Sequence, residues 1–184
     1  MLKLFLEGAY NPGTNSMNYV NPIFANVFLH NAETGQLVAS QTVMVTALGH
    51  ANTTISYPHP VFVTVVVNGY IRTQSASAVD CSNGIDYDFT TSATMAYGDN
   101  QVELAPGVFG FYGGDFNGDG NIDNSDYSIW EEGNNSSTPI QASHVADLNN
   151  DGLVDNADYE IWERNSNNFV SEQLSVTGGL YRAK

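Results

Sequence analysis

Oxygen-bearing side chains recur at a fixed spacing in two stretches near the C-terminal end of this chain. Residues 115–126 and 147–158 both read D-x-N-x-D-G-x-apolar-D-N-x-D, with an offset of 32 residues. A hard cation such as calcium takes six to eight oxygen ligands, and a twelve-residue loop supplies them from positions 1, 3, 5, 7, 9 and 12. The two stretches therefore predict two calcium ions, one in each loop.

The template assigns a ligand to each of these loop positions. The predicted ligands of the first loop are Asp115, Asn117, Asp119, Asn121, Asp123 and Asp126. Those of the second loop are Asp147, Asn149, Asp151, Leu153, Asp155 and Asp158. Position 7 binds only through its main-chain carbonyl, which is why Asn121 and Leu153 can differ. Glycine stands at position 6 of both loops, where the chain must turn sharply.

A simpler interpretation is that Asp, Asn and Gly favour turns, and that Asp-Gly pairs are common in hairpins. That interpretation explains each residue by itself. It does not explain why all six ligand positions are filled twice in the same register, so we favour calcium binding.

The two loops depart from an ordinary EF-hand, because position 12 is Asp and no amphipathic helix precedes either loop. Helix-like stretches instead follow the loops, at 126–132 and 158–164. A duplicated calcium loop that has only an exiting helix and is closed by Asp resembles the dockerin family, over about residues 114–168.

This resemblance implies a docking surface for a protein partner such as a cohesin, formed by loop positions 10 and 11 and by the helices. The matching positions are Asn124, Ser125, Asn156 and Ala157. The helices carry Trp, Glu and Asn where the family typically has Leu and Lys or Arg. Together with the run from Tyr87 to Thr91, the arrangement looks like the C-terminal portions of secreted Bacteroidetes proteins, which are generally non-catalytic.

The chain has 184 residues and a formal net charge of −15, with only five Lys and Arg. Nucleic-acid phosphates would be repelled by this charge, so nucleic acid is excluded as a partner. No basic patch suits an anionic membrane, and no apolar run is long enough for membrane insertion. Because weak calcium sites fill only where calcium is millimolar, we expect an extracellular or cell-surface location. We see no signal peptide at the N-terminus.

Residues before the first loop predict a mainly β fold. The apolar side chains of Leu2, Leu4 and Leu6 alternate with other residues, as in a half-buried strand. Further strands are predicted at 24–30, 36–45, 52–57, 61–68, 85–89, 101–104 and 108–112, separated by turn signals. Many short strands of this kind indicate an Ig-like β-sandwich. The predicted domains are the sandwich at 1–112, a small α-helical calcium module at 113–168, and a tail at 169–184 that is a possible strand.

We predict no enzymatic activity. Asp86 and Asp88 would share one strand face, as a glycosidase pair does, but a polar strand face explains them equally well. Aromatic residues repeat after both loops at helical spacing: Tyr127, Trp130, Tyr159 and Trp162. They suit a core between two helices better than a platform for sugar stacking.

Three functions stay open at this point. The chain is a non-catalytic assembly module, a dockerin-type anchor of a glycan-degrading enzyme, or a carbohydrate-binding module. For the first, the strand with Leu2, Leu4 and Leu6 either completes its own sheet or adds to the open edge of a second copy, head to tail, as in a filament or surface layer.

Overall fold

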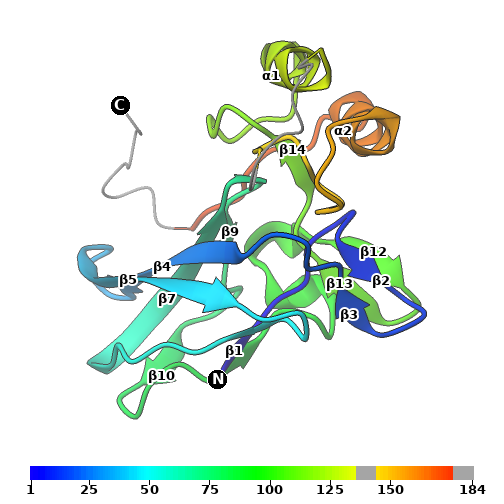
Figure 1. Ribbon diagram of the computed structural model, residues 1–184. Coiled ribbons are helices and arrows are strands. Elements are labelled where there is room, and N and C mark those ends of the chain that lie inside the picture. Colours follow the sequence, from blue (N-terminus) through cyan, green and yellow to red (C-terminus); the bar gives the residue numbers. More distant parts are fainter. Residues whose placement is uncertain (136–143, 176–184) are drawn as a thin grey trace.

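The computed structural model describes residues 1–135 and 144–175 (Figure 1). Within these ranges the chain is mainly β up to residue 115 and then forms two helices, α1 (Asn124–Asn134) and α2 (Asn156–Asn167). Two short 3-10 turns, η1 (Ala93–Met95) and η2 (Tyr97–Asp99), lie between the later strands. The two helices lie side by side above the β-rich part of the molecule (Figure 1).

Most strands belong to one curled sheet with the order β10-β7-β4-β5-β6-β1-β11, and β9 also pairs with β7. Its strands are β1 (Leu2–Lys3), β4 (Ile23–Asn31), β5 (Leu37–Val45), β6 (His50–Ala51), β7 (Tyr57–Val67), β9 (Thr73–Gln74), β10 (Val79–Cys81) and β11 (Tyr87–Asp88). The smaller sheets are built from β2 (Tyr10–Asn11), β3 (Ser16–Met17), β8 (Gly69–Tyr70), β12 (Val102–Ala105), β13 (Val108–Gly110) and β14 (Gly113–Asp115).

This topology confirms the mainly β class but does not confirm an Ig-like sandwich. Among the described residues, one curled sheet of eight strands is joined by three two-stranded sheets. β7 contains residues 61–67 of the strand predicted at 61–68 and is central in the sheet, because it pairs with β4 on one side and with β10 and β9 on the other. The core side chains Val61, Val63 and Val65 are fully buried.

The strand predicted at 52–57 is wrong for residues 52–56, which lie outside every ladder of the described chain. A side chain takes the place of a backbone partner there. The Thr54 N–H donates to the Gln41 side-chain oxygen at 2.8 Å, and the Gln41 amide donates to the Thr54 hydroxyl at 3.2 Å. Side chains that bond to backbone groups compete with ladder formation in this way.

The N-terminal strand pairs within its own chain. Leu2 lies opposite Ala51 of β6 and Tyr87 of β11, and Leu4 donates its N–H to the Gly49 carbonyl at 2.9 Å. Leu6 forms a bridge with Phe111. All three leucine side chains are 0–1 % exposed. This arrangement is the intrachain alternative of the sequence analysis, and an exchange of the strand would have to transfer all of these contacts to a second copy.

The core is continuous from the β-rich part into the helices. One cluster of buried side chains contains Leu2 and Val65 of the sheet together with Trp130 and Trp162 of the helices. The domain boundaries at residues 112 and 168 stay a prediction, and we use them here as names: "the β-rich part" for 1–112 and "the helical module" for 113–168. Residues 171 and 173 form single bridges to Asn121 and Thr73, and the rest of the tail prediction, from 176, lies outside the described residues.

A buried carboxylate joins the two parts. Glu7 is 3 % exposed. Its side chain pairs with Arg164 at 2.6 Å and accepts hydrogen bonds from the Asn165 amide at 2.6 Å and the Gly113 N–H at 3.0 Å. The hydroxyl of Tyr70 donates to the main-chain carbonyls of Glu7 and Leu148. Residues of β-rich and helical segments therefore share a single hydrogen-bond network.

We predict that Glu7→Ala lowers the free energy of unfolding by about 2 kcal/mol, because it leaves the buried Gly113 N–H without its acceptor and the Asn165 amide with only the Gly113 carbonyl. Urea unfolding measures the change. Glu160→Ala, at an exposed acid on α2, is the control and is expected to stay within about 0.5 kcal/mol of the parent chain. Equal unfolding midpoints for the two variants would contradict this role of Glu7.

Candidate calcium centre

A fully buried carboxylate closes each loop. We call residues 115–126 loop I and 147–158 loop II. In loop I, Asp126 accepts the N–H groups of Phe116, Asn117 and Asp123 at 2.8–3.0 Å. Asp158 accepts the corresponding three N–H groups in loop II at 2.8–3.2 Å. Position 12 thereby ties the start of each loop to its end.

Position 1 has the same role in both loops. Asp115 accepts the N–H groups of Asp119 and Gly120, each at 3.1 Å. Asp147 accepts those of Asp151 and Gly152 at 3.1 and 3.0 Å. Both glycines have positive φ values, of 91° and 94°, which confirms the sharp turn predicted at position 6.

Position 9 begins each helix. Asp123 and Asp155 are the N-caps of α1 and α2, and each forms a capping box with the Asp three residues later. Such caps satisfy backbone N–H groups that have no partner within the helix. The helices thus begin two residues before the predicted 126 and 158, and calcium loop and helix start share the same side chains.

The aromatic side chains after the loops form a core, as predicted. Trp130 and Trp162 are 7 % and 6 % exposed, and the ring centroids of Trp130 and Tyr159 are 5.0 Å apart. The indole of Trp130 donates to the Asp155 carbonyl at 3.0 Å, and that of Trp162 donates to the Asp123 carbonyl at 3.2 Å. Each helix therefore supports the N-cap residue of the other.

Burial and crowding of acids decide the electrostatics of the loops. Burial, followed by the charge of Asp126, raises the pKa of Asp115 to about 7. Burial raises the pKa of Asp158 to about 6, against three backbone hydrogen bonds that lower it. Burial also raises the pKa values of Asp126 and Asp147. The fold therefore holds carboxylates where a bound cation would stabilise their charged forms.

The donor set of each loop consists of oxygen atoms only, which fits a hard cation. In residues 1–135 and 144–175, no three His, Cys, Asp or Glu side chains group closely enough to hold a metal ion alone. The template also uses an Asn side chain and a main-chain carbonyl in each loop. The assignment of the twelve ligands therefore stays a prediction, and so does the number of calcium ions.

The four predicted docking residues lie on the surface. Asn124, Ser125, Asn156 and Ala157 are exposed at the N-terminal ends of α1 and α2. The hydroxyl of Ser125 donates to Asp123 and accepts from the Asn117 amide, both at 2.7 Å. By contrast, the structure places Leu2, Leu4 and Leu6 inside the β-rich part, away from this surface.

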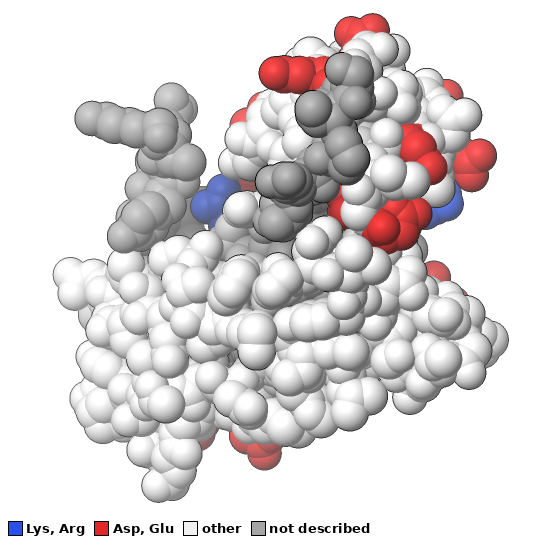
Figure 2. All heavy atoms as spheres, viewed as in Figure 1, with Lys and Arg blue, Asp and Glu red and all other residues white. Residues whose placement is uncertain are grey.

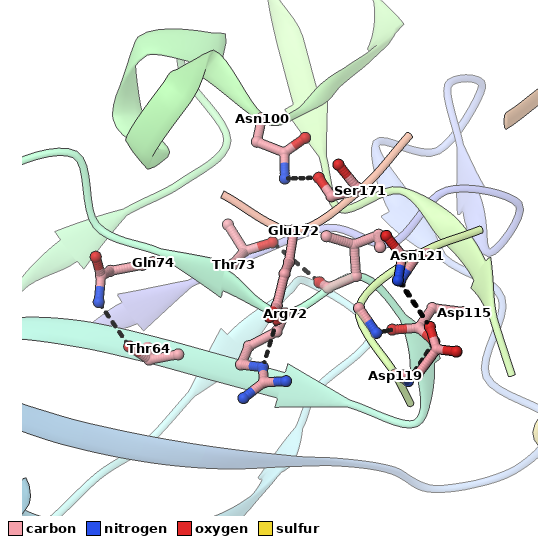
Figure 3. Close-up of polar contacts among 12 residues, drawn as sticks. Thr64, Arg72, Thr73, Gln74, Asn100, Asp115, Asp119, Asn121, Ser171 and Glu172 are labelled. Atoms are coloured by element: carbon pink, nitrogen blue, oxygen red, sulfur yellow. Dashed lines mark hydrogen bonds and ion pairs between the residues drawn. The ribbon is translucent and has the colours of Figure 1, made fainter. Parts of the chain in front are cut away.

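Loop I is also contacted by the chain that follows α2 (Figure 3). Glu172 donates its N–H to the Gly120 carbonyl at 2.7 Å, and its carboxylate pairs with Arg72 at 2.8 Å. Asn100 donates to the Ser171 carbonyl at 3.0 Å. Sequence reasoning missed Glu172 and Glu7, because a single acidic residue outside the repeat gives no signal of what it pairs with.

Asp86 and Asp88 have different surroundings in this structure. Asp86 lies near the N-terminal amine at 3.2 Å and is almost fully exposed. Asp88 accepts from the Thr90 hydroxyl at 2.6 Å and lies 3.8 Å from the Lys3 amine. Each carboxylate is thus engaged with a different neighbour.

These observations define a class of protein: two linked, EF-hand-like calcium loops that each continue into one helix. Residues 113–167 match the family model of the dockerin type I domain. This segment, less than a third of the chain, is therefore a dockerin-like calcium-loop module. Neither the curated proteins nor the solved structures gave a match to the chain.

We predict that Asp115→Ala and Asp147→Ala each abolish one calcium site, because position 1 supplies a ligand through its side chain. Asn121→Ala should change little, because position 7 uses the main-chain carbonyl. Isothermal titration calorimetry counts the sites in each variant. Two full-affinity sites in Asp115→Ala would show that the ligand assignment is wrong.

We further predict that a chelator lowers the melting temperature and reduces the helical circular-dichroism signal. For a site of ~10 μM affinity in ~1 mM calcium, mass action adds roughly 2.7 kcal/mol to stability. Without calcium, the crowded carboxylates of each loop repel one another, so binding energy is also folding energy. The idea fails if excess chelator leaves both the far-UV spectrum and the melting curve unchanged.

Proposed function

We propose that this chain is a non-catalytic, extracellular module for protein–protein assembly, whose helical module binds a cohesin-like partner in the presence of calcium. The exposed position 10 and 11 residues at the starts of both helices carry this proposal, because the calcium loops fix their orientation. The dockerin match supports a protein partner. The dockerin segment is itself non-catalytic. We propose that the β-rich part has no enzymatic activity either.

The charge distribution suits a partner that approaches the helical module. Twelve of the twenty acidic residues and a single basic residue fall between 113 and 168. Between residues 8 and 71, by contrast, Glu33 is the only charged residue. Figure 2 shows the acidic side chains gathered over the helices, above a largely uncharged face of the β-rich part. A basic partner surface would be attracted to the helical end.

We assign the protein to the outside of the cell or the cell surface, because dockerin modules occur in such proteins and because millimolar calcium fills weak sites. In the described part of the chain, neither helix has the length and apolar character that a membrane crossing needs. The Ig-like β-sandwich predicted for residues 1–112 is also part of this proposal.

The alternatives of the sequence analysis have less support. Self-assembly into a filament would require residues 2–6 to leave a place where Leu2, Leu4 and Leu6 are buried. A carbohydrate-binding function has less support, because both tryptophans of the helices are core residues and Tyr127 and Tyr159 are partly buried against that core. The role of a dockerin-type anchor for a glycan-degrading enzyme is compatible with the proposal, since it uses the same surface.

Surface plasmon resonance with a purified cohesin domain tests the proposed function. We predict calcium-dependent binding that is lost in the double variant Ser125→Arg with Ala157→Arg. Two long, positively charged arginine side chains would then occupy docking positions, one in each loop. A double Arg variant at exposed Asn52 and Ser56 is the matched control for the added charge and should bind normally.

Binding that persists in chelator, or that the docking variant retains, would contradict the proposal. If cohesin does not bind and the chain instead sediments as a calcium-dependent oligomer, the self-assembly alternative replaces it.

A further inference from the structure

The two calcium loops differ at position 4, between two predicted ligands. In loop I this residue is Gly118, which is exposed and has nothing within 4 Å of where a Cβ would lie. In loop II it is Asn150, which is only 7 % exposed. Asn150 has a left-handed backbone with a φ of 53°. Asn tolerates this conformation better than most residues, although glycine adopts it most easily.

Asn150 uses its whole side chain to bind a segment of the β-rich part, residues 18–21, which we call the clasp. Its amide donates to the main-chain carbonyls of Asn18 and Asn21 at 3.2 and 3.0 Å. Its oxygen accepts the Asn21 N–H at 3.1 Å. In return, the Asn18 amide donates to the main-chain carbonyl of Asn149 at 3.2 Å. Four hydrogen bonds thus join residues that are about 130 apart in the sequence.

The clasp is itself fixed to the body of the β-rich part. Asn18 donates its N–H to the Ala9 carbonyl, and Met17 donates to the Ala47 carbonyl, both at 2.7 Å. The Met17 side chain is 3 % exposed. Figure 1 shows the chain before α2 reaching down to the part of the molecule around β2 and β3. The clasp can therefore hold loop II against a rigid support.

We propose that the clasp is a structural part of the second calcium site and raises its affinity. The proposal rests on the calcium binding proposed above and concerns how one of the two sites is organised. Asn149 and Asp151, on either side of Asn150, are predicted ligands at positions 3 and 5. Because the clasp holds the backbone between these two ligands before the ion binds, loop II loses less conformational entropy when calcium binds.

The coupling between clasp and calcium is reciprocal. If the clasp strengthens calcium binding at loop II, calcium binding at loop II stabilises the clasp by the same factor. Calcium should therefore protect the backbone N–H groups of residues 17–21 from hydrogen exchange, although these residues supply no ligand. A clasp with a purely structural role would show the same exchange with and without calcium.

The test uses the full chain carrying Asp115→Ala, so that loop II gives the calcium signal in calorimetry. Adding Asn150→Gly removes the side chain while keeping a residue that accepts a positive φ. We expect calcium affinity at loop II to fall about tenfold, which lies within the usual range for coupled sites. Gly118→Asn, at the same position of loop I, is the matched control and should leave loop II unchanged.

Asn18→Ala provides a second variant that removes only the hydrogen bond to Asn149, and we expect it to weaken calcium binding by a smaller factor. It also decides the question if Asn150→Gly does not fold. Hydrogen exchange of residues 17–21, measured with and without calcium in the Asp115→Ala chain, gives the independent readout.

An unchanged affinity in both clasp variants, or exchange at 17–21 that ignores calcium, would overturn the proposal. Failure of the Asp115→Ala chain to bind any calcium would instead overturn the ligand assignment of loop II and the proposed function.

Discussion

Two carboxylates without exposed surface, Asp126 and Asp158, hold the calcium end of this molecule together. Each accepts three backbone N–H groups, and these bonds set the path of the loop, its closure and the start of the following helix. A buried ionised carboxylate is costly unless its oxygens are satisfied. The loops provide that satisfaction locally, from backbone N–H groups of the same twelve residues.

Much of the helical module follows from the sequence because its signals are local. The spacing of Asp, Asn and Gly defines the loops, and a capping residue followed by aromatic residues at helical spacing defines each helix. The mutual support of the two indoles and the two N-caps is not local. The repeat alone indicated that the helices share a core, but it did not identify the backbone groups that the indoles bind.

The β-rich part was less predictable. Apolar runs separated by turn signals predicted strands at the positions of β4, β5 and the central β7. The strand expected at 52–57, by contrast, is mostly replaced by a side-chain contact through Gln41. Long-range polar pairs such as Glu7 with Arg164, 157 residues apart, give no periodic signal at all. The clasp has the same character, because Asn18 and Asn150 look like ordinary turn residues until the fold brings them together.

The separation of charged from uncharged segments has a consequence for how the molecule behaves before any contact forms. With twelve of the twenty acids in the helical module and one charged residue between 8 and 71, the negative charge of the molecule is displaced toward the helices. A positively charged surface that diffuses nearby therefore turns the molecule helices-first, so that encounters begin at the helices more often than random collisions would. This orienting torque weakens as ionic strength rises, since the Debye length is about 8 Å in physiological salt.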